Sequence, residues 1–289
     1  MKLNKKFLTL SLTVIIVLLI FMLYVFFNTR FTSNSSIPYN KDCLTIHYID
    51  VGQGDSILVQ FNNKNLLIDA GCSNRKVHNY LKKCGVKKLN YVIATHPHDD
   101  HIGGMPYIIE SFSIDKFLAP KATNNTTSFK KMITELQKNN LKISSTKAGT
   151  YIPLDHKLSC FVVAPKNSTY KNLNNYSIVL KITYNNTSFL FCGDAENLSE
   201  DEILSSGYNI TSDVLKLGHH GSKTATNNNF LEEVNPKVAI ISCGKGNDYG
   251  HPHKETLKKL KNKNITTYRT DIDGTIILES NGTKIMKRQ

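Results

Sequence analysis

Ten residues, 95–104 (Thr-His-Pro-His-Asp-Asp-His-Ile-Gly-Gly), constrain the fold more than any other part of this sequence. They place three histidines and two aspartates within six positions. The loop follows an apolar run at 89–94, which predicts a buried strand, and precedes residues 105–112, which predict a short helix. So many imidazole and carboxylate groups at one strand end would repel one another unless a cation held them. Zinc, manganese and iron accept these ligand types, so we expect a metal-binding loop between strand and helix.

The spacing inside the loop divides its ligands into two groups. His96 and His98 are two residues apart, so in extended backbone both can face one ion. Asp100 and His101 follow beside a Gly-Gly pair and can face a second ion. Asp99 is ambiguous, since solvent or a hydrogen bond would satisfy it equally well, and we favour Asp100 as the ligand. The alternative is a polar surface loop that happens to be rich in histidine.

Four further segments carry polar or glycine residues where apolar strands are expected to end. They are 50–56 (Asp-Val-Gly-Gln-Gly-Asp-Ser), 67–71 (Leu-Ile-Asp-Ala-Gly), 193–196 (Gly-Asp-Ala-Glu) and 219–222 (His-His-Gly-Ser). With the His-x-His-x-Asp-His loop, this set resembles the metallo-β-lactamase fold superfamily. Within that superfamily it is similar to the soluble hydrolase domain of ComEC-type competence proteins and their stand-alone relatives. The resemblance covers residues 42–289 and implies an α/β (α+β) fold, an αββα sandwich with a metal cleft at one edge.

The resemblance also implies a cage for two divalent metal ions, zinc or manganese. Its expected ligands are His96, His98, Asp100, His101, Asp194 and His220. Asp194 follows an expected strand, where a carboxylate can bridge both ions. Adjacent histidines point in different directions, so we assign His220 to the metal and His219 to a transition-state contact, with the reverse order open. Asp69 would orient the ligand loop, and we expect catalysis to depend on Asp100, His219 and Asp69.

Residues outside the cage are expected to contact substrate. They are Gln53, Asp55, Ser56, Asn174, Ser177, Ser222 and His251. The segment 53–56 borders the cleft in the resembled family, although a tight structural turn is an equal alternative. Asn174 and Ser177 stand in the region where the wider superfamily has a further histidine ligand. This oxygen-richer first site favours manganese beside zinc, and it leaves open whether both ions are resident.

The N-terminal residues predict a membrane anchor. Residues 1–6 form a basic cluster, and residues 7–27 are uncharged and rich in Leu, Ile, Val and Phe. About 20 apolar residues span a bilayer core. Because the basic residues precede this run, we expect a cytoplasmic N-terminus, a linker at 28–41 and the domain 42–289 outside the cell membrane. A cleaved signal peptide, which would secrete the domain, is the alternative, but its apolar region would be shorter and would end in small residues.

The formal net charge of +13 is unevenly placed. Five positive charges and no acidic residue lie in the first 41 residues, which leaves +8 for the region 42–289. A basic domain with a cleft attracts polyanions such as nucleic acid or teichoic-acid-like polymers. A solvated lysine surface is the plain alternative. The six cysteines form no Cys-x-x-Cys pair, so a zinc knuckle is not expected.

Local patterns give further expectations. Residues 62–64 (Asn-Asn-Lys) predict a hairpin turn between two strands. Asp273-Gly274 and Asn281-Gly282 predict two more turns of the hairpin type. His78 falls on an amphipathic helix expected at 74–84, and we expect its side chain to be exposed.

Together these observations predict a membrane-anchored, extracytoplasmic, metal-dependent hydrolase. We expect a phosphodiesterase or DNase that uses a metal-bound hydroxide as the nucleophile. Its expected partners are DNA or another phosphodiester polyanion, and the membrane through residues 7–27. One alternative is a hydrolase of another ester, such as choline phosphate on cell-wall polymer, or of a lactam. An alternative of a different class is a non-catalytic nucleic-acid-binding module.

Overall fold

The computed structural model describes residues 14–23 and 37–288. Residues 14–23 are helical, and the residues from Pro38 onward form a separate compact unit. The predicted tail at 1–6, more than half of the predicted anchor at 7–27 and more than half of the predicted linker at 28–41 lie outside the described residues. Among the helices that are described, none combines the length and apolarity needed to cross a membrane.

The first of two sheets in the compact unit has eight strands, in the order β14-β13-β1-β2-β3-β4-β5-β6. The strands are β1 Leu44–Tyr48, β2 Ile57–Phe61, β3 Lys64–Ile68, β4 Lys88–Ile93, β5 Ser113–Ala119, β6 Ile143–Ser145, β13 Ile276–Ser280 and β14 Ile285–Lys287. Strands β3 to β6 run parallel, whereas the other neighbours pair antiparallel. The turn predicted between β2 and β3 is confirmed, because Asn62 and Asn63 both adopt positive φ, as a tight hairpin turn requires.

The second sheet has six strands, in the order β12-β11-β10-β9-β8-β7. Their bounds are β7 Leu158–Ala164, β8 Val179–Tyr184, β9 Thr187–Phe191, β10 Val214–Lys216, β11 Val238–Ile241 and β12 Thr266–Arg269. Strands β9 to β12 run parallel, and β7, β8 and β9 form an antiparallel meander. Parallel strands need covered faces, which explains their near-continuous apolar sequences.

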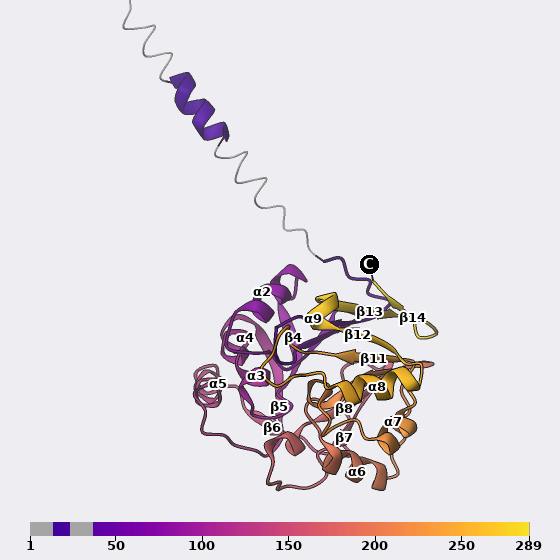
Figure 1. The fold of residues 1–289 in the computed structure, drawn as a ribbon. Coiled ribbons are helices and arrows are strands. Elements are labelled where there is room, and N and C mark those ends of the chain that lie inside the picture. Colours follow the sequence, from indigo (N-terminus) through magenta and orange to yellow (C-terminus); the bar gives the residue numbers. More distant parts are fainter. Residues whose placement is uncertain (1–13, 24–36, 289) are drawn as a thin grey trace, which may run out of the picture. The chain divides into compact units, whose positions relative to one another are not determined.

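The helices lie outside the two sheets. Those between β3 and β6 are α2 Lys76–Lys83, α3 Asp99–Ile102, α4 Met105–Ser111 and α5 Thr127–Lys138. Those between β9 and β12 are α6 Asn197–Ser205, α7 Asn228–Val234 and α8 Lys254–Asn262. Figure 1 shows the first group on one side of the sheets and the second group on the other. A short helix α9 (Thr270–Asp273) and two 3₁₀ turns, η1 (Leu173–Tyr176) and η2 (Gly218–Gly221), complete the compact unit.

The core between the sheets is apolar and continuous. Ile46 of β1 and Ile182 of β8 are fully buried within one cluster that draws on both sheets. The aromatic rings of Tyr48 and Phe191 meet across the interface with centroids 6.1 Å apart. A second cluster packs the outer face of the second sheet against α6, α7 and α8. The predicted αββα sandwich is therefore confirmed.

The parallel strands bring the polar segments to one rim of the sandwich. Parallel strands end on the same side, so the residues that follow β3, β4, β5 and β6 lie along one edge of the first sheet. In the second sheet, the residues that follow β9, β10 and β11 share an edge in the same way. Side chains from these two edges meet, as described below, so both edges belong to one rim.

Two local predictions were wrong. Asp273-Gly274 is not the turn of a hairpin, because β12 belongs to the second sheet and β13 to the first, and α9 lies between them. The chain changes sheets at this point, which local sequence cannot reveal. His78 is buried rather than exposed, since α2 directs its ring edge-on against Phe112 at the end of α4. Asn281-Gly282, by contrast, does join the antiparallel pair β13 and β14.

Candidate metal centre

The metal-binding loop is built by the end of β4 and the short helix α3. His98 precedes α3 in extended backbone, and Asp99, Asp100 and His101 form its first turn, so Asp100 and His101 project from a helix. Close packing fixes this turn. At Gly54, whose φ is +128°, a Cβ would lie 2.2 Å from the carbonyl oxygen of Asp100. Position 54 therefore has no room for a side chain. Its glycine allows the loop before β2 to contact the ligand loop.

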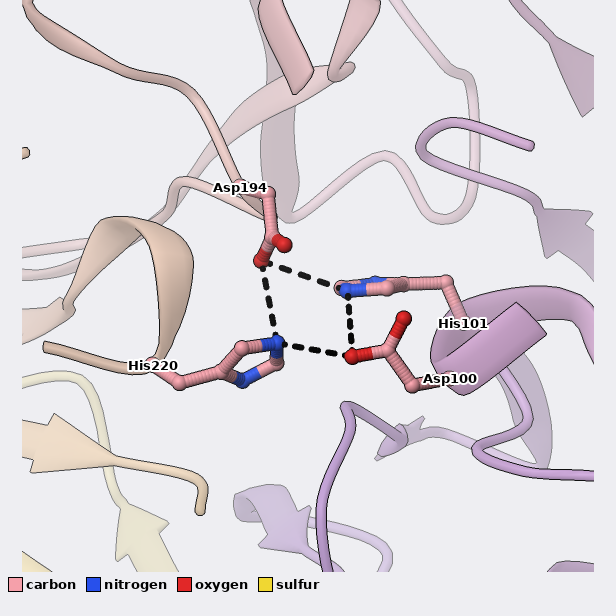
Figure 2. A group of neighbouring side chains, drawn as sticks. All are labelled: Asp100, His101, Asp194 and His220. Atoms are coloured by element: carbon pink, nitrogen blue, oxygen red, sulfur yellow. Dashed lines mark ion pairs between the residues drawn. The ribbon is translucent and has the colours of Figure 1, made fainter. Parts of the chain in front are cut away.

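Four side chains converge into a first cluster in Figure 2, namely Asp100, His101, Asp194 and His220. Their ligand atoms all lie within 4.8 Å of one another. The Nε2 atoms of His101 and His220 lie 3.2 and 3.4 Å from Asp194 Oδ1. His220 Nε2 also lies 3.2 Å from Asp100 Oδ2. The four donors come from both sheets, since Asp194 follows β9 and His220 follows β10.

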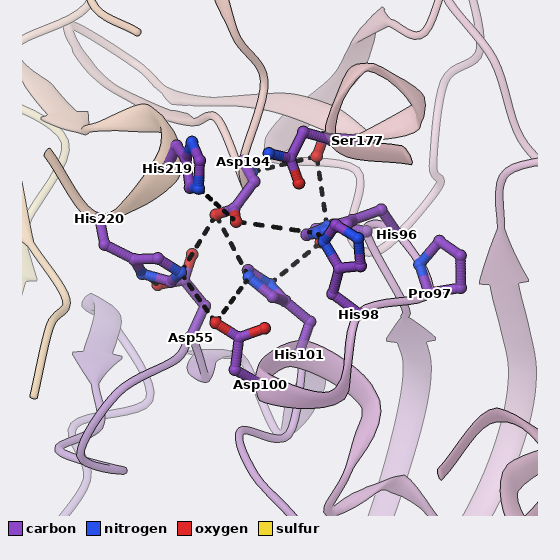
Figure 3. Close-up of polar contacts among 12 residues, drawn as sticks. Asp55, His96, Pro97, His98, Asp100, His101, Ser177, Asp194, His219 and His220 are labelled. Atoms are coloured by element: carbon purple, nitrogen blue, oxygen red, sulfur yellow. Dashed lines mark hydrogen bonds and ion pairs between the residues drawn. The ribbon is translucent and has the colours of Figure 1, made fainter. Parts of the chain in front are cut away.

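A second cluster adjoins the first and shares Asp194 with it (Figure 3). It consists of His96, His98 and Asp194. His96 Nε2 lies 2.9 Å from His98 Nδ1 and 3.8 Å from Asp194 Oδ2. Asp194 thus directs one carboxylate oxygen to each cluster, the arrangement expected of a bridging ligand. The structure brings together all six residues predicted as metal ligands, and Asp99 belongs to neither cluster.

The first cluster contains polar atoms that lack a partner. Among residues 14–23 and 37–288, no hydrogen-bond partner reaches His101 Nε2, His220 Nε2 or Asp194 Oδ1, although all three atoms are buried. Leaving a buried polar atom unpaired costs roughly 1–3 kcal/mol, so three such atoms pointing at one another need a common partner. A divalent cation accepts imidazole nitrogen and carboxylate oxygen together, so the donor set fits a metal ion.

The electrostatics of the clusters favour a positive charge. Burial would raise the pKa of Asp194, but the charges of His101 and His220 outweigh it and hold this pKa well below its usual range. Burial likewise would lower the pKa of His101, yet Asp194, Asp69 and Asp100 raise it well above its usual value. Carboxylates therefore surround His101 strongly enough to attract a cation, whether a proton or a metal ion. A metal ion would replace the proton on the imidazole.

Asp69 supports the ligand loop, as predicted from the resemblance. It adopts φ +57° at the end of β3 and is fully buried. Its carboxylate accepts hydrogen bonds from Thr95 N (2.8 Å) and Thr95 Oγ1 (2.6 Å). It also pairs with His101 Nδ1 at 2.8 Å, which leaves Nε2 of that ring free to face the cluster.

Lys216 is a site residue that the sequence analysis missed. This lysine of β10 is fully buried, and its ammonium donates to Asp55 Oδ2 at 2.7 Å and to the carbonyl oxygen of Leu217 at 2.9 Å. The other oxygen of Asp55 lies 3.5 Å from His220 Nδ1. His220 Nδ1 also donates to the carbonyl oxygen of Ser242 at 2.9 Å. A lysine inside an apolar strand is the signal that could have revealed this buried pair.

A cavity of about 350 Å³ opens beside the two clusters. Five of the predicted substrate contacts or catalytic residues line it: Gln53, Asp100, Asn174, His219 and His251. Asn124, Thr126 and Tyr249 also line it and were not predicted. Tyr249 is 66% exposed, and its ring stacks on that of His251 at 5.7 Å.

The other predicted substrate contacts are buried and do not line this cavity. Asp55 pairs with Lys216, and the Ser56 hydroxyl donates to the carbonyl oxygen of Asp69 at 2.9 Å. The hydroxyl of Ser177 accepts from Asp194 N at 3.0 Å and lies 3.3 Å from His96 Nδ1. Ser222 is hydrogen-bonded to Thr224. All four side chains are buried, so they contact other parts of the protein and not the cavity.

His219 and His220 diverge, as adjacent residues were expected to do. Both have positive φ, so the backbone turns sharply within η2, shortly after β10. His220 Nε2 enters the first cluster, whereas His219 faces the cavity. The distance from His219 Nε2 to Asp194 Oδ2 is 3.9 Å. His219 Nδ1 lies 3.0 Å from Glu196 Oε1. Glu196 immediately precedes α6, and this contact orients the ring.

The fold and the ligand loop agree with a match to a known family. Residues 49–245 match the family described as the metallo-beta-lactamase superfamily. The chain belongs to this superfamily. Superfamily members are metal-dependent hydrolases, and the two clusters described above are the candidate metal site in this chain.

Individual relatives refine the family assignment. The chain is 32% identical over 251 residues to ComE operon protein 3 of Bacillus subtilis. This alignment covers 80% of the chain and 32% of that protein. The chain is 28% identical over 244 residues to Recombination protein 2 of Haemophilus influenzae, covering 82% and 29%. The chain thus spans about a third of the length of these curated relatives. The resemblance to ComEC-type competence proteins is confirmed.

Solved structures confirm the fold alone. Igni18, a metallo hydrolase from Ignicoccus hospitalis, superposes with a TM-score of 0.55 at 16% identity. The superposition covers 81% of this chain and 98% of Igni18.

Proposed function

We propose that this superfamily hydrolase is a metal-dependent phosphodiesterase that cleaves DNA. The observation that carries the proposal is the convergence of six ligands in two clusters that share Asp194, beside an open polar cavity. Two cations held by these ligands would supply positive charge for a displacement at phosphorus. The competence and recombination relatives favour DNA as the phosphodiester. The charge of +8 over residues 42–289 supports a polyanionic substrate.

The chain's residues would divide the work as follows. Asp100, His101 and His220 would hold one ion and His96 and His98 the other, with Asp194 between them. When bound, these ions activate water at neutral pH and neutralise negative charge on the attacked centre. His219 faces the cavity and would donate from Nε2 to a phosphoryl oxygen, while Glu196 holds its Nδ1. This contact grows stronger as charge develops on that oxygen.

Tyr249 would bind a base of the substrate. It is exposed at the cavity and already stacks on His251 with the two rings tilted by only 20°. An aromatic face of this kind accepts any nucleobase, since stacking requires no particular hydrogen-bond pattern. The lining contains amide and hydroxyl groups, such as Asn174 and Thr126, that can donate to phosphate oxygens.

We also propose that residues 7–27 anchor the protein in the cell membrane with the hydrolase domain outside. The support is the uncharged run itself and the basic residues that precede it. Secretion after signal cleavage is the alternative. The mass of the mature protein in a membrane fraction distinguishes the two, because cleavage would remove the N-terminal residues.

The test of the phosphodiesterase proposal uses the full chain in mild detergent. Single-stranded DNA, double-stranded DNA and bis(p-nitrophenyl) phosphate are incubated with manganese, zinc or EDTA. We expect metal-dependent cleavage that EDTA abolishes. Asp194→Asn should reduce kcat/KM by at least about 10³-fold, because it removes the negative charge shared by both clusters. Asp201→Asn on α6, which lies in neither cluster, should leave it unchanged.

Each other outcome contradicts a distinct part of the proposal. Cleavage of the small diester without DNA would keep the metal chemistry and move the substrate to cell-wall polymers or another ester. DNA binding without any hydrolysis would indicate a non-catalytic nucleic-acid-binding module. Full activity in Asp194→Asn would overturn the assigned metal centre itself.

A further inference from the structure

A second cavity, of about 630 Å³, lies at the edge strands of the two sheets. One wall is the turn that follows β6 and contains Lys147, and the facing wall is the segment after β7 that contains Lys166. Backbone hydrogen bonds join the two walls. Ala148 N donates to the carbonyl oxygen of Pro165, and Gly149 N donates to that of Val162, both at 2.9 Å. These two backbone hydrogen bonds hold the walls together.

This second cavity lies on the same rim as the metal cleft. Strands β4, β5 and β6 are parallel, so the ligand loop after β4, Lys121 after β5 and Lys147 after β6 share one edge. Two segments run from one cavity to the other. Lys121 lines the second cavity while Asn124 lines the metal cleft. In η1, Tyr176 lines the second cavity and Asn174 the metal cleft, so their Cα atoms are at most about 7.6 Å apart.

The lining of the second cavity is basic and hydroxylated. Lys121, Lys147 and Lys166 contribute three ammonium groups, and no aspartate or glutamate is among the described residues that line it. Within the described residues, the ammonium groups of Lys121 and Lys147 form no hydrogen bond or ion pair, and that of Lys166 contacts only Ser205 Oγ at 3.4 Å. The nearby carboxylate of Glu202 is already bound by Tyr170 Oη at 2.6 Å and by Asn167.

We propose that this second cavity is a backbone subsite that binds phosphates of the DNA strand next to the one being cleaved. The inference rests on the proposed function, since it extends the same substrate along the rim. Unpaired ammonium groups and hydroxyl donors bind phosphate oxygens without reading sequence. A strand held here would be oriented so that its neighbouring phosphodiester lies over Asp194 and His219. A substrate with a single phosphodiester cannot place one phosphate at Asp194 and another in the subsite.

A triple variant and a charge-matched control test the subsite. Lys121→Ala/Lys147→Ala/Lys166→Ala removes its three charges. Lys82→Ala/Lys83→Ala/Lys87→Ala removes three exposed charges near the start of β4, at the opposite rim. Both are made in the full chain in detergent. We measure kcat/KM with manganese for a thymidine oligonucleotide of about 20 nucleotides and for bis(p-nitrophenyl) phosphate, and the salt dependence of oligonucleotide binding with EDTA present.

The subsite predicts a specific pattern. In the subsite variant, the slope of log Kd against log salt should fall by about 2, since each phosphate contact to a single strand contributes about 0.7. Its kcat/KM for the oligonucleotide should fall about tenfold while that for the small diester is unchanged, and the control variant should match wild type. Equal effects of the two variants, or no effect of the subsite variant, would overturn the subsite. If wild type hydrolyses neither substrate, the phosphodiesterase proposal fails, while the binding slopes still decide the subsite.

Discussion

Three residues of the candidate site adopt left-handed backbone. Asp69, His219 and His220 have φ of 57°, 46° and 53°. A non-glycine residue in this region costs on the order of 1 kcal/mol or more, so each must be held by its surroundings. Asp69 is held by Thr95 and His101, and His220 by the carbonyl oxygen of Ser242. This backbone directs Asp69 to His101, His219 to the cavity and His220 into the first cluster.

At this scale, Lys216 provides a test of stability. Lys216→Met would leave the buried carboxylate of Asp55 without its partner, and we expect the free energy of unfolding to fall by about 3–5 kcal/mol. The double variant Asp55→Asn/Lys216→Met removes both charges and should recover most of this loss. Urea unfolding, followed by circular dichroism, measures each value.

An exposed pair of the same kind serves as the control for Lys216. Lys237 pairs with Asp213 at 2.9 Å, and its side chain is 83% exposed. Lys237→Met should therefore cost less than about 1 kcal/mol, because solvent screens a surface pair. If Lys216→Met and Lys237→Met lowered the free energy of unfolding equally, burial would add nothing to the stabilising effect of the Asp55 pair.

Tyr249 provides a test of substrate binding at the same scale. Tyr249→Ala should lower kcat/KM for a DNA oligonucleotide by between about 5-fold and 150-fold, because stacking of one base contributes about 1–3 kcal/mol. Tyr249→Phe keeps the aromatic face and should retain activity. Steady-state kinetics on all three proteins decides the matter, and an equal loss in the two variants would assign the effect to the hydroxyl group instead.

Residue identity and spacing predicted the ligands but not the residues behind them. All six predicted ligands meet in the two clusters, because each follows an apolar strand whose end can be recognised locally. Asp55 was expected at the substrate, but it is buried against Lys216, which lies 161 positions away in the sequence. Only the packing of one sheet on the other brings these two residues together. Tyr249 gave no local signal either, since its loop has no periodic pattern.

At the scale of elements, the sequence pattern predicted strands more completely than their connections. The run predicted before the ligand loop is β4, and the turn predicted at 62–64 joins β2 to β3. The single-turn helix α3 and the 3₁₀ turn η1 escaped prediction, because four residues are too few for helical periodicity. The change of sheet between β12 and β13 escaped for another reason, since an Asp-Gly pair suits both a hairpin and a helix end.

A buried carboxylate of α6 binds the segment before α7, and its titration should affect stability. Glu200 is fully buried in α6, and it accepts hydrogen bonds from the backbone N–H groups of Thr226 and Asn227 before α7. Burial raises the pKa of Glu200 from 4.5 to about 7, against the lowering effect of these donors. Between these two values the folded chain keeps a proton that the unfolded chain has lost.

The sign of the effect follows from that difference in bound protons. The free energy of unfolding should fall by up to about 3 kcal/mol as pH rises from about 4.5 to about 7. Outside this range, Glu200 should not contribute to the pH dependence of stability. Glu200→Gln should remove this contribution, whereas Glu255→Gln on the exposed start of α8 should keep it. Urea unfolding at several pH values provides the comparison. Identical slopes in wild type and Glu200→Gln would contradict the raised pKa.

At the scale of the whole molecule, the metal centre joins the two sheets. Asp100 and His101 follow β4 of the first sheet, and Asp194 and His220 follow strands of the second. The apolar core already holds the sheets together, but the rim also brings together buried carboxylates and unpaired imidazole nitrogens. A cation bound there satisfies groups from both sheets at once. Metal binding is therefore expected to stabilise the folded compact unit and not merely to activate it.

That expectation has a measurable size. A metal present at about 100 times its Kd stabilises the folded state by about 2.7 kcal/mol, which corresponds to a rise in Tm of roughly 5–10 °C for a domain of this size. The rise should disappear in Asp194→Asn, persist in Asp201→Asn, and diminish at acidic pH as protons compete for the imidazoles. Scanning calorimetry of the full chain with manganese, zinc or EDTA gives the values. An equal rise in Asp194→Asn would place the stabilising ion elsewhere, because no arrangement of these ligands joins the two clusters without that carboxylate.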